Sequence, residues 1–222
     1  MGEGKVNYWL GNYDKALKQL RDCLNVGNEY NIQNIIGDSQ YFISQIYLNK
    51  NMYKDAMLNI DFAIKTVDNE KKLQSRLAKY YDCKGLIYKF MGRLDNAINM
   101  HERALSISKE INDKHALRKY LSNIGLIYEE QASFEKAINI YAKSLSVAKE
   151  MNEKRSICVS YCNIGYILEY QGAINQALKY FRRAFRLSEK IGYKAGIGGY
   201  SNNMAQIYIK KQQYNKAIPL LN

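Results

Sequence analysis

The stretch Asn123–Lys154, NIGLIYEEQASFEKAINIYAKSLSVAKEMNEK, recurs in altered form forty residues earlier and forty residues later in the chain. Two series of small residues mark this period, Gly85, Gly125, Gly165 and Ala205 in one and Ala97, Ala137, Ala177 and Ala217 in the other. A fixed period of this size is typical of solenoid proteins, which repeat one supersecondary unit along the chain. Because a solenoid grows one unit at a time, each unit is expected to contact mainly its neighbours.

Each period contains two helical patterns. In Lys114–Glu130 and again in Phe134–Met151, apolar residues recur at the three- and four-residue steps of a helix that buries one side. A short turn around Ala132 separates the two patterns. Sister copies place Gly92 and Gly172 at this turn position, where a helix often ends in a left-handed conformation. The sequence therefore predicts an all-α chain of paired helices.

The recurring small residues have a steric explanation. Gly125 lies on the first predicted helix of its repeat and Ala137 on the second. Glycine inside a helix costs about 1 kcal/mol relative to alanine, so its return at one phase predicts a close approach between the paired helices. Asp113 precedes a first helix and is a suitable cap for it.

The repeated positions resemble the tetratricopeptide repeat. The Gly-x-x-Tyr step of that family occurs as Gly85/Tyr88 and Gly125/Tyr128. Its turn aromatic occurs as Tyr13, Tyr53, Phe134 and Tyr214, and its central alanine as Ala16, Ala56, Ala97, Ala137, Ala177 and Ala217. Two departures are the replacement of the usual Trp and a unit of forty residues rather than the commoner, about 34-residue one.

The long repeat is similar to those of kinesin light chain, of G-protein-signalling adaptors and of bacterial peptide-sensing regulators and sensor-kinase input regions. This resemblance implies a right-handed α-α superhelix whose first helices line a concave groove for a protein or peptide. We expect one array over residues 1–222, with a partial repeat at 1–28, repeats at 31–70, 71–112, 113–152 and 153–192, and a truncated repeat at 194–222. Neither end carries a polar capping helix, so the chain is expected to be a fragment of a longer protein or to cover its ends by association.

No grouping of residues indicates catalysis, a metal or a cofactor. His101 takes the helix position that Tyr141 and Phe181 hold in sister repeats, so packing explains it. The four cysteines lack zinc or disulfide spacing and are interpreted as buried thiols. Unpaired thiols favour a reducing, cytoplasmic location, although an extracytoplasmic sensor region stays an alternative. We therefore expect a protein that is not an enzyme.

The net charge of +12 raises the question of a nucleic-acid partner. The densest basic set lies in one predicted helix and comprises Lys179, Arg182, Arg183, Arg186 and Lys190. A solvated helix face also explains these charges, and no zinc finger, recognition helix or RNA-binding signature accompanies them. Nucleic acid is thus not an expected partner, and binding through this helix stays a third alternative. No apolar run approaches the roughly 20 residues of a membrane span.

The predicted binding surface lies on the first helices. Asn123, Asn163 and Asn203 form a series at the forty-residue period, and an amide repeated along a groove can pair with the backbone of an extended peptide. The alternative is that each Asn bridges adjacent helices within the array. Neighbouring aromatic and acidic residues would favour an aromatic or basic ligand residue. The full predicted set is Asn123, Leu126, Glu129, Glu130, Asn163, Tyr166, Glu169, Tyr170, Asn202, Asn203 and Gln206.

The sequence hypothesis is a non-catalytic binding scaffold that serves as the sensory or adaptor part of a larger regulator. Ligand engagement would change the curvature or end packing of the array, and an attached module would respond. The alternative is a structural scaffold that forms homo-oligomers through its uncapped ends.

Overall fold

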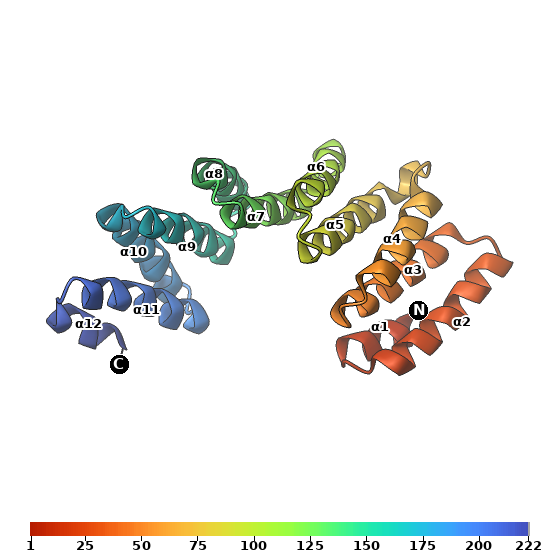
Figure 1. The fold of residues 1–222 in the computed structure, drawn as a ribbon, viewed down its shortest axis with the longest axis horizontal. Coiled ribbons are helices and arrows are strands. Elements are labelled where there is room, and N and C mark those ends of the chain that lie inside the picture. The colour runs from red at the N-terminus through yellow and green to blue at the C-terminus, as the bar shows by residue number, and fades with distance from the viewer. Residues whose placement is uncertain (222) are drawn as a thin grey trace. The chain divides into compact units, whose positions relative to one another are not determined.

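The computed structural model describes residues 1–221, which are almost entirely helical and contain no β-strand (Figure 1). The first helices of the successive pairs are α1 (Gly2–Trp9), α3 (Gln33–Asn49), α5 (Gln74–Phe90), α7 (Lys114–Glu130), α9 (Lys154–Tyr170) and α11 (Lys194–Lys210). The second helices are α2 (Tyr13–Glu29), α4 (Tyr53–Val67), α6 (Leu94–Glu110), α8 (Phe134–Glu150), α10 (Ile174–Lys190) and α12 (Tyr214–Leu221). A short 3-10 helix, η1 (Lys71–Leu73), precedes α5. Within residues 1–221, every helix is too short or too polar to cross a membrane.

The turns confirm the helix boundaries that the sequence predicts. Ala132, Gly92 and Gly172 all take left-handed conformations, with φ of 54°, 72° and 77°. The predicted cap is also present, because Asp113 Oδ1 accepts a hydrogen bond of 3.0 Å from the backbone N–H of Ala116. Local turn chemistry therefore accounts for where α5, α7 and α9 end and where α7 begins.

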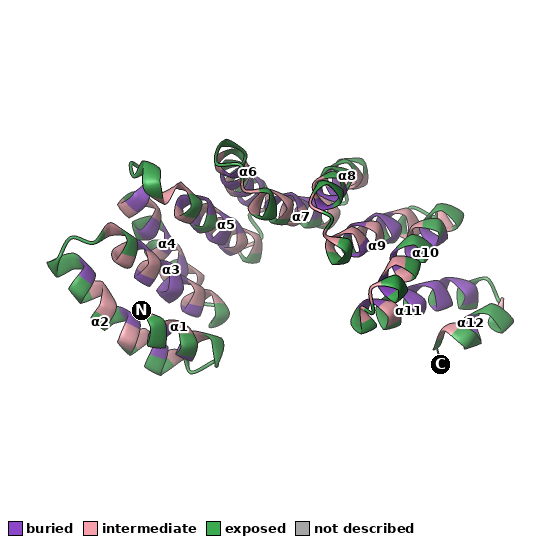
Figure 2. Ribbon diagram, turned by 180° about the vertical axis from the view of Figure 1, so that it is seen from behind, coloured by how far each residue is buried: buried purple, intermediate pink, exposed green. Residues whose placement is uncertain are grey.

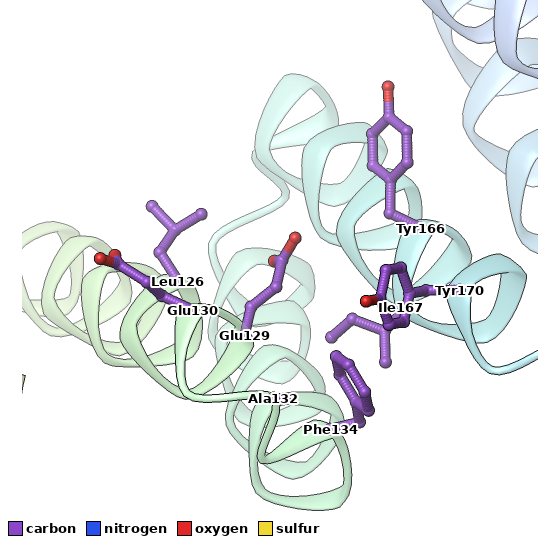
Figure 3. Close-up of a pocket in the computed structure, with 8 residues that line it drawn as sticks. All are labelled: Leu126, Glu129, Glu130, Ala132, Phe134, Tyr166, Ile167 and Tyr170. Carbon is purple, nitrogen blue, oxygen red and sulfur yellow. The ribbon is translucent and has the colours of Figure 1, made fainter.

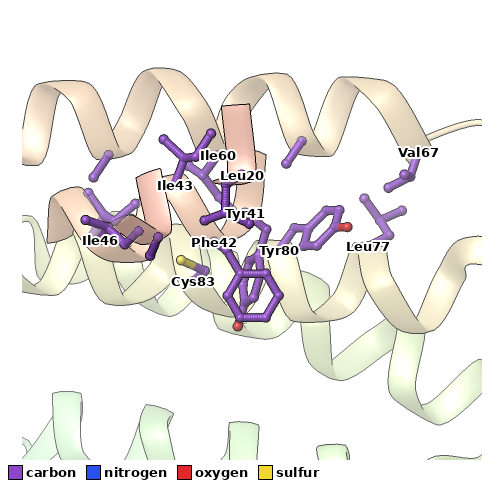
Figure 4. Close-up of a cluster of buried hydrophobic side chains, with 14 residues drawn as sticks. Leu20, Tyr41, Phe42, Ile43, Ile46, Ile60, Val67, Leu77, Tyr80 and Cys83 are labelled. Atoms are coloured by element: carbon purple, nitrogen blue, oxygen red, sulfur yellow. The ribbon is translucent and has the colours of Figure 1, made fainter. Parts of the chain in front are cut away.

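The helices divide into two compact units, unit 1 from Met1 to Tyr120 and unit 2 from Leu121 onward, so the boundary falls within α7. In unit 1, residues from α2 to α5 form one apolar core, in which the rings of Tyr41 and Tyr80 stack with centroids 5.2 Å apart (Figure 4). In unit 2, α9 to α12 share a core that contains Phe181 and Met204. Figure 2 shows the buried residues along the sides of the helices that face their neighbours.

Glycine occurs where a ring packs directly against a first helix. The three pairs are Gly85 with His101, Gly125 with Tyr141, and Gly165 with Phe181. A Cβ atom added to these glycines would lie 2.8, 2.5 and 2.7 Å from the respective ring, which is too close for any side chain. The predicted close approach of paired helices is thereby confirmed. In α3 and α11, Ser44 and Ala205 take the glycine position, and the residues at the ring position are Ile60 and Leu221.

The cysteines contribute to packing. Cys83, Cys158 and Cys162 are buried free thiols, and Cys23 is partly buried. Burial raises the pKa of Cys83 and of Cys162 to about 12, so both thiols stay protonated at neutral pH.

Candidate functional site

A cleft of about 450 Å³ opens in unit 2 where the C-terminal ends of α7 and α9 meet the start of α8 (Figure 3). We call it the α7–α9 cleft. Its lining residues are Leu126, Glu129, Glu130, Ala132, Phe134, Tyr166, Ile167 and Tyr170. Five of the residues predicted from sequence thus lie together, namely Leu126, Glu129, Glu130, Tyr166 and Tyr170. The volume falls in the range of sites that hold a small ligand or a few side chains.

One flank of the cleft is apolar. The rings of Phe134 and Tyr170 lie with centroids 5.0 Å apart, and Ile167 is buried beneath the surface on the same side of the view in Figure 3. Tyr170 remains 78% exposed, and Leu126 on α7 is 43% exposed. Exposed apolar and aromatic area in a concave site is available for burial against a partner, at about 25 cal/mol per Å².

Glu129 supplies a negative charge at the centre of this cleft, between Leu126 and the aromatic flank in Figure 3. Its carboxylate accepts a 3.0 Å hydrogen bond from the phenol of Tyr141. Burial and the neighbouring carboxylate both raise the pKa of Tyr141, so this phenol is a neutral donor. Among residues 1–221, no cationic side chain pairs with Glu129. The charge of this half-buried carboxylate is therefore not offset by a cation among these residues.

Glu169 is placed differently. Its carboxylate forms a 2.7 Å ion pair with Lys210 of α11, and the Glu169 side chain is 15% exposed. The charge of Glu169 is thus neutralised within unit 2, and Glu169 is absent from the lining of the α7–α9 cleft. Of the three glutamates in the predicted acidic patch, Glu129 and Glu130 line the cleft.

The three members of the asparagine series have different surroundings. Asn203 is 7% exposed, its Oδ1 accepts a 2.9 Å hydrogen bond from Tyr166 Oη, and its Nδ2 lies 3.5 Å from Cys162 Sγ. These contacts join α9 to α11, as the bridging alternative predicts. Asn123 and Asn163 are half-buried, and the described part of the chain provides no hydrogen-bond partner for the amide of Asn163.

The remaining predicted residues lie apart from the cleft. Asn202 and Gln206 are exposed, four residues apart on α11. They share one face of the helix, so they offer two amides to a ligand that extends beyond α9.

Sequence reasoning missed several contributors to the cleft. Phe134 is recognisable as the turn aromatic of its repeat, but its contact with Tyr170 depends on how α8 meets α9. The repeat pattern identifies Tyr141 as a core residue, and its side chain is indeed buried. Its phenol also donates a hydrogen bond to Glu129, which the pattern does not indicate. Neither contact follows from helical periodicity, because each joins two different helices.

A buried ionic cluster in unit 1 was missed as well. Asp82 Oδ1 lies 3.0 Å from His101 Nδ1, and Asp82 Oδ2 accepts a 2.7 Å hydrogen bond from Lys119 Nζ. Burial raises the pKa of Asp82, but His101 and Lys119 outweigh this effect and hold that pKa below its usual range. The cluster joins α5, α6 and α7, with His101 and Asp82 buried at 0% and 2% exposure and Lys119 half exposed at its edge. The packing explanation of His101 holds, with an ionic partner added.

Two family models match parts of the chain, one at residues 76–150 and one at residues 159–191, and both describe the tetratricopeptide repeat. Among curated proteins, no sequence matches the chain.

Several solved structures share the fold. BtubC (BKLC) from P. vanneervenii is 16% identical over 94% of this chain and 87% of its own, with a TM-score of 0.81. A signal transduction ATPase with numerous domains from Pyrococcus horikoshii, which has a tetratricopeptide repeat sensor, is 19% identical over 99% of this chain and 34% of its own, with a TM-score of 0.84. A Rap protein complexed with competence and sporulation factor is 17% identical over 94% of this chain and 56% of its own, with a TM-score of 0.67. The chain thus spans about a third and about half of the last two proteins, and identities this low establish the fold alone.

Proposed function

Because this chain belongs to the tetratricopeptide repeat family, we propose that it is a non-catalytic scaffold that binds a partner protein through an extended peptide. The peptide crosses the first helices of unit 2, from the α7–α9 cleft to the exposed amides of α11. The single observation that carries this proposal is the charge of Glu129, which is half-buried, beside an exposed aromatic flank and without a cationic partner among residues 1–221.

The chemistry of the cleft favours a basic residue of the peptide. The methylene stem of an Arg or Lys side chain packs against the aromatic flank, while its head group reaches the carboxylate of Glu129. An ionised pair of this kind forms shorter and stronger hydrogen bonds than a neutral pair does. Tyr166 and Tyr170 provide additional ring faces for the cation.

The amides take the peptide backbone on either side of this residue. The half-buried amide of Asn163 on α9 has no hydrogen-bond partner among residues 1–221, and Asn202 and Gln206 present exposed amides on α11. Each amide offers one acceptor and two donors, which suits the alternating groups of an extended backbone. Asn123 is placed on α7 at the same repeat position as Asn163 and extends this series toward the start of unit 2.

The larger role that fits this scaffold is the sensory or adaptor part of a regulatory protein. Two proteins with the same fold support this role, since one is described as having a tetratricopeptide repeat sensor and the other is a Rap protein complexed with competence and sporulation factor. Ligand binding would then change how the repeats pack, and an attached output module would respond to that change.

The test begins with selection of 12-residue peptides from a phage library on the immobilised chain. The peptides that bind are expected to be enriched in Arg or Lys. The affinity of the strongest peptide, measured by fluorescence anisotropy, should fall about tenfold or more in Glu129→Gln, since a hydrogen bond to a charged group contributes about 1.5–3 kcal/mol.

Glu135→Gln is the matched control, because Glu135 is exposed on α8 of the same unit and lies outside the cleft. It removes the same charge and should leave the affinity within about twofold, as expected for a screened surface charge. Selected peptides without basic residues, or equal losses in the two variants, would show that the cleft does not recognise a cation.

A second candidate function, self-association, is favoured by exposed apolar side chains on α1 and at Leu10, the residue that follows it. Val6, Trp9 and Leu10 are 56%, 74% and 68% exposed. Light scattering over a dilution series distinguishes the two functions. Only the self-associating scaffold requires an oligomer that dissociates on dilution, and Trp9→Ser would then shift it to the monomer.

A further inference from the structure

The outer face of α10 carries five cationic side chains in one stripe. Lys179, Arg182, Arg183, Arg186 and Lys190 are all exposed, and their spacing places them on the side of α10 opposite its buried residues Ala177, Phe181, Ala184 and Ser188. Helical rise spreads the stripe over about 16 Å. We call this set the α10 basic stripe.

These charges are not neutralised by the chain itself. Among residues 1–221, none of the five side chains forms an ion pair with a carboxylate. Glu189 is the single acidic residue from position 170 to the end of the sequence. Two of the five contact tyrosines instead. Arg182 donates a hydrogen bond to Tyr208 Oη, and the Arg183 guanidinium lies 5.5 Å from the ring centroid of Tyr180.

The α10 basic stripe differs from the rest of the chain in its lack of ion pairs. Several cations on other helices are paired, as Lys84 is with Asp61 at 2.7 Å and Lys210 with Glu169 at 2.7 Å, whereas none of the five cations of the stripe is paired with a carboxylate among residues 1–221. Unpaired like charges on one helix repel one another and cost stability. A polyanionic partner that covers the stripe would relieve this repulsion.

The spacing of the charges fits a nucleic-acid backbone better than an acidic peptide. Over the same length of about 16 Å, one strand of B-form DNA presents roughly five phosphates, one for each cation. An extended acidic peptide directs a side chain to the same face only about every 6.6 Å, so it would neutralise roughly two or three of the cations. Three of the five cations are arginines, whose planar groups bind phosphate through two parallel hydrogen bonds.

A membrane surface fits less well. A helix that lies on a bilayer inserts apolar side chains beside its basic ones. The large apolar side chains of α10, such as Phe181 and Leu178, are buried in unit 2, and none of the exposed residues of this helix is apolar. We propose that the α10 basic stripe binds the phosphate backbone of nucleic acid without reading its sequence. This site is separate from the α7–α9 cleft and is independent of the function proposed for it.

The experiment measures binding of a fluorescein-labelled RNA and a DNA duplex, each of mixed sequence and roughly 20 nucleotides or base pairs, between about 50 and 200 mM NaCl. Affinity should fall steeply with salt, with a slope of log K against log salt of roughly −3 to −4, as four or five released counterions predict. The triple variant Arg182→Gln/Arg183→Gln/Arg186→Gln should flatten that slope by about 2 to 3.

The control variant is Lys136→Gln/Lys143→Gln/Lys149→Gln, which removes three exposed cations from α8 of the same unit. It has the same net charge as the α10 variant and should keep the slope within about one. Circular dichroism of both variants establishes that they are folded. Equal flattening by the two variants, absence of nucleic-acid binding at low salt, or binding to phosphatidylserine vesicles in place of nucleic acid would each overturn the proposal.

Discussion

Asp38 and Asp82 of unit 1 and Glu129 of unit 2 all lie on first helices, but their carboxylates have opposite surroundings. In unit 1, Asp38 accepts a 2.8 Å hydrogen bond from Tyr80 Oη and lies 3.2 Å from Arg76 Nε, and Asp82 contacts Lys119 and His101. In unit 2, the only hydrogen-bond partner of Glu129 among the described residues is the neutral phenol of Tyr141, and no cation pairs with it there. The side chains are chemically alike, so the difference lies in whether the neighbouring helices supply a cation.

The presence or absence of a cationic partner distinguishes carboxylates that stabilise the fold from the carboxylate of the candidate site. A buried carboxylate that is paired and hydrogen-bonded inside its unit holds helices together, and removing it leaves charged or polar partners uncompensated. A half-buried carboxylate with a neutral donor is poised for a partner that brings its own positive charge. Four further predictions follow from three variants, in order of the expected size of effect.

The largest effect is expected for Asp82→Ala. The free energy of unfolding of the variant, measured by urea denaturation, should be about 3 kcal/mol lower than that of the wild type. This value is at the low end of the range for breaking a buried ion pair, because Lys119 is half exposed and its ammonium group can be solvated when Asp82 is absent. A loss below about 1 kcal/mol would show that this cluster does not stabilise unit 1.

The same cluster predicts a pH dependence. Because the folded-state pKa of Asp82 is lowered, its stabilisation is present above the unfolded-state pKa of about 3.9 and is lost as the pH falls through the folded-state value. Stability measured between about pH 6 and pH 3 should therefore fall less in Asp82→Ala than in the wild type.

An intermediate effect is expected for Gly125→Ala. The added methyl group would lie 2.5 Å from the ring of Tyr141, the residue that also holds Glu129, so overpacking should cost about 1–3 kcal/mol in the same assay. Gly198→Ala is the matched control on α11, because an added Cβ there has no neighbour within 4 Å. The control should stabilise the helix by about 0.5–1 kcal/mol, and two changes of the same sign would refute the steric explanation.

The smallest effect is expected for Glu169→Gln. Its partner Lys210 is 65% exposed, and an exposed pair of this kind contributes about 0–1 kcal/mol. Affinity for the peptide selected above should stay within about twofold, because the charge of Glu169 is already neutralised inside unit 2 and screened from the cleft. A loss as large as that of Glu129→Gln would remove the distinction between neutralised and available carboxylates.

Much of the fold follows from local sequence. The bounds of α7 and the left-handed turn at Ala132 are readable from a single repeat, because helical periodicity and turn chemistry act over a few residues. The forty-residue period then extends the result along the chain. Even the close approach at Gly125 is predictable, since glycine inside a helix needs a steric reason.

The candidate site was predictable only in part. Leu126, Glu129, Glu130, Tyr166 and Tyr170 share the cleft as residues at equivalent phases of successive first helices. Their electrostatic environment was not predictable, because the partner of Glu169 is 41 residues away and that of Glu129 is 12 residues away, each on another helix. The same limit applies to Asn203, whose contacts with α9 favour bridging at that position over the peptide ladder.

The sequence by itself determined that this chain is a series of paired helices, where the helices end and at which small residues the two helices of a pair approach closely. Those properties depend on periodicity and on steric fit between adjacent segments. The tertiary structure alone decided which charges are neutralised and which remain available. That outcome depends on contacts between side chains of different helices, where a change of a few ångströms converts an ion pair into a separated charge.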